Sequence, residues 1–247
     1  MKKILVSIPT YNESENIKQV CQRIFKIKKN LNLIIIDDNS PDGTADKINK
    51  LKKKYKKLIL IKRKRKLGIG SAIRRAMNYA LKNNYDVLIT LDADLSHQPE
   101  NIPSFLKYIE LNDFVIGSRY IKGGKSDYTG YRNFVSKFAN KICRLLLNIH
   151  LNEFTTSFRA YNKKCLRILN EIPLYSDGYS SLVEFIFYID RAGLKYIEVP
   201  IHFKDRFKGK SKIPKLQIIY GGLKLIELFI KRSIIPKKKI IKNEKSN

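Results

Sequence analysis

The fold of this chain is decided by residues 3–44, which are KILVSIPTYNESENIKQVCQRIFKIKKNLNLIIIDDNSPDGT. A short apolar strand is predicted over 3–8, a helix with apolar residues at helical spacing over 15–28, and a continuously apolar strand over 33–36. Together these elements form a β-α-β unit. Strands that are apolar throughout, rather than alternating, are typical of a parallel sheet with helices on both faces.

The alternation of helices and strands continues beyond this unit. It predicts helices over 45–55 and 69–83, and strands over 58–62, 87–91 and 115–116. In open parallel sheets, ligands bind at the carboxyl ends of the strands. Polar clusters follow the first, second and fourth strands, at 9–13, 37–44 and 92–97. We therefore expect these clusters to converge on one edge of an α/β fold.

The composition indicates a globular chain with an anionic partner. Of 247 residues, 43% are hydrophobic, which is enough for a sizeable core, and one large domain is the simplest division. Lys and Arg number 50 against 22 Asp and Glu, a formal net charge of +28. Nucleic acid, an anionic membrane surface or a phosphorylated substrate would each suit this charge. A compositional bias toward lysine would explain the dispersed lysines, but less well the clusters at 62–66 and 237–239.

The cysteines and the apolar runs bear on where the chain works. Cys21, Cys143 and Cys165 are odd in number and lack the paired spacing of a disulfide framework or a zinc site. This pattern favours a reducing, cytosolic setting. No apolar run approaches the roughly 18 to 20 residues that are needed to cross a bilayer.

Two amphipathic helices are predicted in the second half. One spans 134–151, with apolar residues on one face and basic residues on the other. The second spans about 216–235 and leads into a basic tail that we expect to be disordered after Pro236. Either helix could pack against the sheet or lie in a membrane interface.

Asp92 and Asp94 are the strongest metal-binding candidates. Carboxylates at i and i+2 point to the same side of an extended segment, so the two can share a divalent cation. Asp37 and Asp38 are expected at a neighbouring strand end, and four carboxylates there would repel one another without a cation or a hydrogen-bonding ligand. A hard, oxygen-liganded Mg²⁺ or Mn²⁺ would keep positions open for a diphosphate. No P-loop is present, and residues 66–70 lack the full dinucleotide-binding pattern.

Six motifs in one order carry a specific resemblance. They are PTYNE at 9–13, DDNSPDGT at 37–44, DADLSH at 92–97, GSRY at 117–120, TSFRAY at 156–161 and VPIHF at 199–203. With them the chain resembles dolichyl-phosphate mannosyltransferase and its bacterial polyprenyl-phosphate relatives. The resemblance implies the GT-A fold of family 2 glycosyltransferases, which is Rossmann-like with a mostly parallel sheet. It also implies a domain over 1–212, followed over 213–247 by an interfacial amphipathic helix and a basic tail.

The resemblance also assigns site residues. It places the nucleoside on Pro9, Tyr11, Glu13, Ile36 and Asp38, and the nucleotide and metal on Asp92, Ala93 and Asp94, with Ser96 as a further metal-side position. It places Arg119, Arg206 and Lys212 on the donor phosphates, and Arg119 with Arg132 on the acceptor phosphate. The implied catalytic residues are Asp94, Arg119, Arg206 and Lys212, with Mg²⁺ or Mn²⁺ as the cofactor. Arginine suits these places because its planar fork binds phosphate in a bidentate way.

Two of these assignments have plainer alternatives. Arg119 could instead form a structural ion pair with Asp113 or Asp127, and Arg206 or Lys212 could be solvated loop charges. Residues 205–212 are predicted to form a polar loop that closes over a diphosphate.

The reaction that the resemblance implies is transfer of a hexose with inversion. The donor would be a nucleoside diphosphate sugar, GDP-mannose above all, and the acceptor a polyprenyl or dolichyl phosphate. A phosphate monoester has a second pKa near about 6 and is already ionised, so no general base is needed, and His97 and Glu184 are assigned none. The enzyme would be cytoplasmic and peripheral to the cytosolic face of a membrane. A membrane-anchoring subunit is a further candidate partner.

Two other readings of the sequence remain open. A family 2 transferase acting on a polysaccharide or protein hydroxyl would need a base, for which Glu184 is the best candidate. A basic nucleic-acid-binding protein would suit the charge, but no such motif is present, and we expect no nucleic-acid partner. Glu153 and the pair Thr156-Ser157 depart from the pattern of the relatives, which bears on the geometry of the acceptor site.

Overall fold

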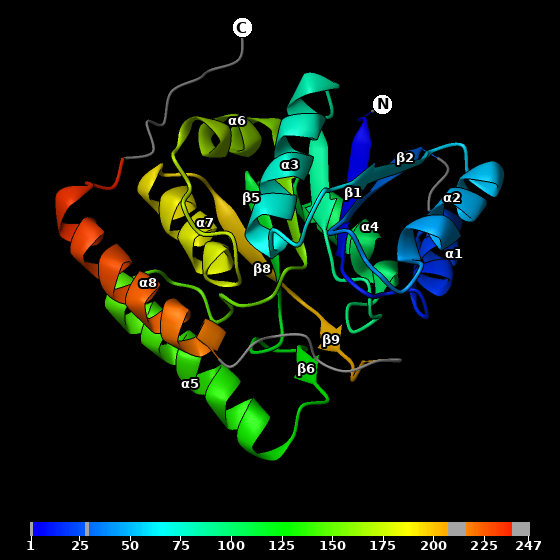
Figure 1. Ribbon diagram of the computed structural model, residues 1–247. Coiled ribbons are helices and arrows are strands. Elements are labelled where there is room, and N and C mark those ends of the chain that lie inside the picture. The colour runs from blue at the N-terminus through cyan, green and yellow to red at the C-terminus, as the bar shows by residue number, and fades with distance from the viewer. Residues whose placement is uncertain (1, 28–29, 207–215, 239–247) are drawn as a thin grey trace, which may run out of the picture.

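The computed structural model describes residues 2–27, 30–206 and 216–238. Within these residues, seven strands form one sheet in the order β3-β2-β1-β4-β7-β5-β8 (Figure 1). The strands are β1 (Ile4–Thr10), β2 (Leu31–Asp37), β3 (Leu58–Lys62), β4 (Val87–Thr90), β5 (Phe114–Ser118), β7 (Arg159–Asn162) and β8 (Tyr196–Pro200). A separate parallel pair is formed by β6 (Lys125–Ser126) and β9 (His202–Phe203).

Helices cover both faces of the sheet. They are α1 (Ile17–Ile27), α2 (Thr44–Lys54), α3 (Ile69–Lys82), the short 3-10 helix η1 (Pro99–Asn101), α4 (Ile102–Tyr108), α5 (Gly130–Leu147), α6 (Lys163–Glu171), α7 (Ser180–Arg191) and α8 (Leu216–Ile234). From β1 to β4, no end of a predicted element differs from the observed one by more than two residues. The prediction of a mostly parallel α/β sheet is confirmed.

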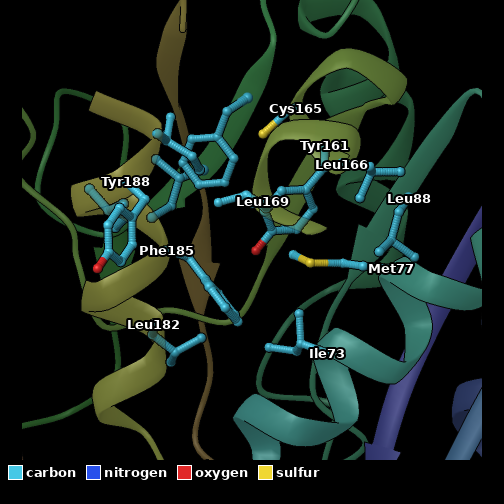
Figure 2. Packing of buried hydrophobic residues seen from close by; sticks show 14 of the residues in the cluster. Ile73, Met77, Leu88, Tyr161, Cys165, Leu166, Leu169, Leu182, Phe185 and Tyr188 are labelled. Atoms are coloured by element: carbon cyan, nitrogen blue, oxygen red, sulfur yellow. The ribbon is translucent and has the colours of Figure 1, made fainter. Parts of the chain in front are cut away.

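The sheet separates two apolar cores. Successive strand residues point to opposite faces, so Leu5 packs into the core under α3, α6 and α7, while Val6 packs into the core under α1, α2 and α4. Figure 2 shows the first core, where Met77 of α3 and Phe185 of α7 face each other. Both faces of β1 and β2 are therefore buried, which is why these strands are continuously apolar.

Strand β7 was not predicted, although it lies inside the sheet. It pairs antiparallel with β4 on one side and with β5 on the other. The strand is four residues long, Arg-Ala-Tyr-Asn, and has no apolar alternation to reveal it. Arg159 is fully buried because its guanidinium donates to three backbone carbonyls, those of Phe154, Thr156 and Leu182.

The helices α5 and α8 lie side by side away from the sheet (Figure 1). Helix α5 begins and ends four residues earlier than predicted, because Asn148 adopts a left-handed conformation (φ 54°) that ends it. Arg232 of α8 donates to the carbonyl of Leu146 on α5. No helix among the described residues is both long and apolar enough to cross a bilayer.

The start of the basic tail differs from the prediction of disorder after Pro236. The Nζ of Lys237 bonds to the Asp190 carboxylate (2.5 Å), and the Lys238 N–H bonds to the Arg191 carbonyl (2.9 Å). Residues 239–247 lie outside the described part of the chain, as does the predicted domain boundary at 212. The division into 1–212 and 213–247 stays a prediction.

Replacing Gly70 with alanine is expected to destabilise the protein by about 1–3 kcal/mol. Gly70 lies in the first turn of α3, and an added Cβ would lie 2.5 Å from both the Ser176 carbonyl oxygen and the Ser181 hydroxyl oxygen. The backbone of the 176–177 segment would have to move to make room. Urea unfolding followed by circular dichroism measures the change.

Gly221→Ala is the matched control for this substitution. Gly221 lies within α8, and an added Cβ there meets nothing within 4 Å. Alanine has the higher helix propensity, so this variant should be neutral or more stable by up to about 1 kcal/mol. Equal stability of the two variants would contradict the close packing at Gly70.

Candidate functional site

A pocket of about 180 Å³ opens at the carboxyl edge of the parallel strands. Its walls come from the segments that follow β1, β2 and β4, from the start of α3, and from two more distant segments of the chain. The lining residues are Pro9, Thr10, Tyr11, Glu13, Asp38, Lys66, Gly68, Ile69, Asp92, Ala93, Asp94, Gly178, Tyr179 and Arg206. The expected convergence of the three polar clusters on one edge is therefore confirmed.

Most of the predicted donor-site residues line this pocket. Eight do so: Pro9, Tyr11, Glu13, Asp38, Asp92, Ala93, Asp94 and Arg206. Four others, Ile36, Ser96, Arg119 and Arg132, do not. Lys212 and the rest of the predicted closing loop beyond Arg206 lie outside the described residues.

The Asp92-Ala93-Asp94 segment leaves β4 and is held from the side of β7. The Ser157 hydroxyl donates to Asp92 Oδ1 (2.5 Å), and the Asp92 backbone N–H donates to His97 Nδ1 (3.2 Å). The remaining ring nitrogen of His97, Nε2, then carries the proton and bonds to the Thr156 hydroxyl (2.9 Å). Of the two departures from the family pattern, Ser157 thus contacts Asp92 directly, and Thr156 contacts His97, which positions Asp92.

Burial shifts the pKa values of these groups. Burial lowers the pKa of His97, and the nearby Asp92 and Asp94 only partly offset this, so the imidazole is neutral at pH 7. Burial, with the charge of Asp94, raises the pKa of Asp92 despite the opposing effects of His97, Ser157 and Arg206. Leu95 has a left-handed backbone (φ 64°), a conformation uncommon for leucine, and the turn lets the Ser96 N–H donate to Asp94 Oδ1 (3.0 Å).

Arg206 brings a cation to the acidic side of the pocket. Its guanidinium lies 2.9 Å from Asp94 Oδ2 and 3.3 Å from Glu13 Oε1. Glu13 is itself held by the Asn16 side chain, which donates to Glu13 Oε2 (2.8 Å). The carboxylates of this wall are therefore arranged to face positive charge.

Asp37 and Asp38 lie at the end of the neighbouring strand β2, as expected, and their carboxylates have protein partners. Asp37 is fully buried and accepts hydrogen bonds from the Thr10 and Ser40 hydroxyls. Asp38 pairs with Arg63 and accepts the backbone N–H groups of residues 67 and 68. Both carboxylates are used to shape loops. No three His, Cys, Asp or Glu side chains gather as metal ligands in the described part of the chain, which leaves the Asp92–Asp94 pair.

Six lining residues were not among the predicted site residues: Thr10, which belongs to a predicted polar cluster, and Lys66, Gly68, Ile69, Gly178 and Tyr179, which do not. The Nζ of Lys66 lies 4.2 Å from the centre of the Tyr11 ring, a cation–π contact. The basic cluster at 62–66 was a signal for it, because Lys66 and the Asp38 partner Arg63 both belong to that cluster. No local pattern indicated a role for Gly178 and Tyr179. Desolvation and the charge of Asp92 raise the pKa of the Tyr179 phenol.

Arg119 forms a buried ion pair instead of facing the pocket. Its Nε and Nη2 donate to the two oxygens of Glu153, at 2.7 and 2.8 Å, and Nη2 also donates to the Thr155 hydroxyl. The partner is neither Asp113 nor Asp127. Burial raises the pKa of Glu153, but the charge and hydrogen bonds of Arg119 and Thr155 lower it further, to below its ordinary value. Glu153, which departs from the pattern of the relatives, is therefore the ion-pair partner of Arg119.

The remaining predicted residues have other surroundings. Ile36 is fully buried in the core under α3, and Ser96 is buried behind Asp94. Arg132 is exposed in the first turn of α5. Glu184 is fully buried in α7 and does not line the pocket, so it is not placed to act as a base there.

The sequence over 5–169 matches the family described as glycosyl transferase family 2. This chain belongs to that family. The glycosyltransferase is similar to an undecaprenyl-phosphate mannosyltransferase of Micrococcus luteus, with 34% identity over 85% of this chain and 87% of that protein. It is also similar to a polyprenol monophosphomannose synthase of Mycolicibacterium smegmatis, with 32% identity over 92% of this chain and 86% of that protein. A dolichol-phosphate mannosyltransferase of Pyrococcus furiosus is 34% identical over 98% of this chain and 70% of that protein.

Solved structures share the fold of this glycosyltransferase. A glucosyl-3-phosphoglycerate synthase of Mycobacterium tuberculosis, in complex with Mn²⁺, UDP and glucosyl-3-phosphoglycerate, has a TM-score of 0.66 at 19% identity, over 95% of this chain and 81% of that one. A mannosyltransferase from Pyrobaculum calidifontis in complex with GDP-mannose and Mn²⁺ has a TM-score of 0.62 at 15% identity, over 96% of this chain and 65% of that one. The predicted GT-A fold is confirmed.

Glu153→Gln is expected to destabilise this glycosyltransferase by about 3–5 kcal/mol, because Arg119 would stay buried without a counter-charge. The control is Glu100→Gln, whose carboxylate pairs with Arg23 but is 56% exposed, and which should cost less than about 1 kcal/mol. Chemical unfolding at neutral pH measures both changes. Similar losses in the two variants would contradict the importance of the buried pair.

The same pair predicts a pH dependence. Because the pKa of Glu153 is lowered on folding, its stabilising contribution is fully present above the ordinary carboxyl pKa of about 4.3 and is lost as the pH falls through the lower folded value. The difference in unfolding free energy between the wild type and Glu153→Gln should therefore shrink in acid. A difference that stays constant down to the acid unfolding transition would contradict this linkage.

Proposed function

We propose that this glycosyltransferase transfers a hexose, with inversion, from a nucleoside diphosphate sugar to the phosphate of a polyprenyl lipid. Mannose carried by GDP is the favoured donor. The observation that carries the proposal is the pocket that Asp92 and Asp94 line together with Tyr11, with Arg206 beside Asp94. The named relatives, which cover most of the chain, are mannosyltransferases or mannose synthases of polyprenyl and dolichyl lipids.

The donor diphosphate would bind through a divalent cation on Asp92 and Asp94. Mg²⁺ or Mn²⁺ suits the site, because each needs only one or two carboxylates besides phosphate oxygens and water. When bound, the ion would neutralise charge on the departing diphosphate. Arg206 lies at Asp94 and can add a bidentate guanidinium contact to the same phosphates. Two solved structures of the same fold were determined with Mn²⁺.

The nucleoside would lie between Tyr11 and the turn at 66–69. The backbone N–H groups of Leu67 and Gly68 are held by Asp38, so this carboxylate shapes the turn and also lines the pocket. Lys66 lies above the Tyr11 ring and brings a positive charge to the entrance of the pocket. Ile69 supplies an apolar surface for the base.

A phosphate acceptor suits the groups around the pocket better than a hydroxyl acceptor. A lipid monophosphate is ionised at neutral pH and needs no general base. Both ring nitrogens of His97 are already hydrogen-bonded, one to the Asp92 N–H and the other to the Thr156 hydroxyl. Glu184 lies outside the pocket. A hydroxyl acceptor would require one of these groups to accept its proton.

The lipid would be reached through the face formed by α5 and α8, which we define as the helical face. Exposed apolar side chains lie along both helices: Tyr131, Phe134, Phe138 and Leu145 on α5, and Ile219, Tyr220, Leu223, Ile226, Phe229, Ile230 and Ile234 on α8. Lys137, Lys141 and Arg144 border a cavity of about 500 Å³ beside them, and none of the three pairs with a carboxylate within the described residues. Such a face suits the interface of an anionic, cytosolic membrane leaflet.

Asp94→Asn is expected to lower metal-dependent hexose transfer by about a hundredfold or more, because one of two carboxylates for the cation is lost. The assay incubates the protein, polyprenyl phosphate in detergent and Mn²⁺ with labelled GDP-mannose, GDP-glucose, UDP-glucose or UDP-N-acetylglucosamine in turn. Label is then followed into the lipid phase.

Asp46→Asn is the control for this assay, since Asp46 is exposed in α2 away from the pocket and should leave transfer unchanged. Transfer from one donor would identify the sugar. Donor hydrolysis without labelled lipid would contradict the acceptor class, and binding of none of the donors would contradict the function as a whole.

The double variant Phe134→Ser/Phe138→Ser is expected to bind phosphatidylglycerol-containing vesicles at least about tenfold more weakly than the wild type. Burying one phenylalanine side chain is worth about 1.5–3 kcal/mol, and these two stack on the exposed face of α5. Leu111→Ser is the control, because Leu111 is 83% exposed but lies in the turn after α4. Vesicle sedimentation measures binding, and equal binding of all three proteins would contradict docking through this face.

A further inference from the structure

One wall of the pocket is a single segment of chain, residues 175–179, which we call the pocket wall. Gly178 and Tyr179 of this wall line the pocket. Gly178 also lines a second cavity, of about 330 Å³, on the opposite side, where Tyr220, Leu223 and Lys224 of α8 form the other boundary. Gly178 therefore borders open space in both cavities. The backbone of Ser176 and Asp177 packs closely against Gly70 and Gly68 at the start of α3, so the position of the wall is set by this packing and by specific bonds.

From one side, the pocket wall is held by α3. The Gly70 N–H donates to the Asp177 carbonyl (2.7 Å), and Arg74 Nη1 donates to the Ser176 carbonyl (2.7 Å). Arg74 also pairs with the Asp177 carboxylate. These bonds fix the carbonyl groups of the wall.

From the other side, the pocket wall is held by Glu184. This carboxylate lies in the second turn of α7 and is fully buried. Its Oε2 accepts the Ser176 N–H (3.0 Å), and its Oε1 lies 3.4 Å from the Tyr175 nitrogen, whose N–H it accepts. The Tyr175 and Ser176 N–H groups of the wall thus depend on one buried carboxylate.

The counter-charge of Glu184 comes from α8. Lys224 Nζ lies 3.5 Å from Glu184 Oε1 and 2.7 Å from Glu227 Oε2, and only 14% of its side chain is exposed. Lys231 lies two turns further along α8, and its Nζ is 5.6 Å from the centre of the Tyr175 ring. Helix α8, which carries much of the exposed apolar surface, lies beside α7 (Figure 1). It therefore reaches the pocket wall through the pair of Lys224 and Glu184.

A buried ion pair is a costly way to join two helices. The desolvation of both charges often cancels their attraction, and apolar residues of similar size would give as much stability. What a carboxylate provides here, and an apolar residue could not, is an acceptor for two backbone N–H groups at fixed positions. The bonds to Ser176 and Tyr175 indicate that Glu184 is used for geometry.

We propose that Glu184 and Lys224 are positioning residues of the donor pocket: they hold residues 175–179 where Gly178 and Tyr179 shape the nucleotide-sugar site. Neither residue touches the donor. Because Lys224 belongs to α8, donor affinity depends on how that helix is seated, which links the helical face to the pocket. The inference rests on the proposed function for the identity of the donor, but the placement of the pocket wall is independent of it.

The experiment compares Lys224→Met with a control on the same helix. Arg232→Met is the control, since Arg232 also makes one contact from α8, to the Leu146 carbonyl, and does not touch the pocket wall. Lys224→Arg keeps the charge, and Lys224→Met/Glu184→Gln removes the pair but keeps an acceptor for the Ser176 N–H. Three quantities are measured: the melting temperature, amide hydrogen exchange of the peptide over 174–180, and the Kd of fluorescent GDP and UDP analogues with Mn²⁺.

Lys224→Met should raise the nucleotide Kd about three- to tenfold, the size of one or two weakened hydrogen bonds, and speed exchange at 175 and 176. Lys224→Arg should match the wild type, and the double variant should recover most of the affinity, because no uncompensated charge stays buried. Arg232→Met should change neither Kd nor exchange in the wall.

Four results would overturn the inference. In Lys224→Met, amide exchange of the pocket wall at the wild-type rate or an unchanged nucleotide Kd would do so. In the other variants, nucleotide binding by the double variant that is weaker than by Lys224→Met, or an equal rise of the Kd in Arg232→Met, would do so. If Lys224→Met melts before it can be assayed, the double variant and Lys224→Arg decide the question. A wild-type protein that binds neither nucleotide contradicts the proposed function, whereas the exchange measurement still tests the pocket wall.

Discussion

The position of β4 in the sheet is the constraint on which the site depends. This strand pairs parallel with β1 and antiparallel with β7, so the chain leaving β4 meets the chain entering β7 at the same edge. Thr90 donates to the Ser157 carbonyl, and Ser157 in turn donates to Asp92. Arg159 secures that junction by bonding three carbonyls. The aspartates of the pocket thus take their direction from a strand that lies about 65 residues further along the chain.

Charge pairing divides the acidic residues by role. In a chain of net charge +28, carboxylates are the scarce groups, and each buried one has a particular partner. Asp38 pairs with Arg63 and shapes the turn beside the pocket, and Glu153 forms a buried ion pair with Arg119. Asp94 faces the pocket together with Arg206. The same residue type therefore builds loops in one place and provides the candidate metal site in another, according to what lies opposite it.

The pocket and the helical face share structural elements. The pocket lies at the carboxyl edge of the parallel strands, and the helical face lies along α5 and α8 (Figure 1). Between them lies the 175–179 segment, which α3 holds through Gly70 and Arg74, and which α7 and α8 hold through Glu184 and Lys224. A water-soluble donor and a lipid acceptor would have to meet at such a junction, since one comes from solvent and the other from a bilayer.

Local sequence signals were enough to locate the parallel half of the fold and most of the residues that line the pocket. Continuous apolar strands and helical periodicity predict β1 to β4, the polar clusters at strand ends predict the place of Asp94, and the family resemblance adds Tyr11. Tertiary contacts alone set β7, the Glu153 partner of Arg119, the separate partners of Asp37 and Asp38, and the approach of Gly178 and Tyr179. Each of these is a choice among partners far apart in the chain. Such choices depend on which groups packing brings together, and no local pattern records them.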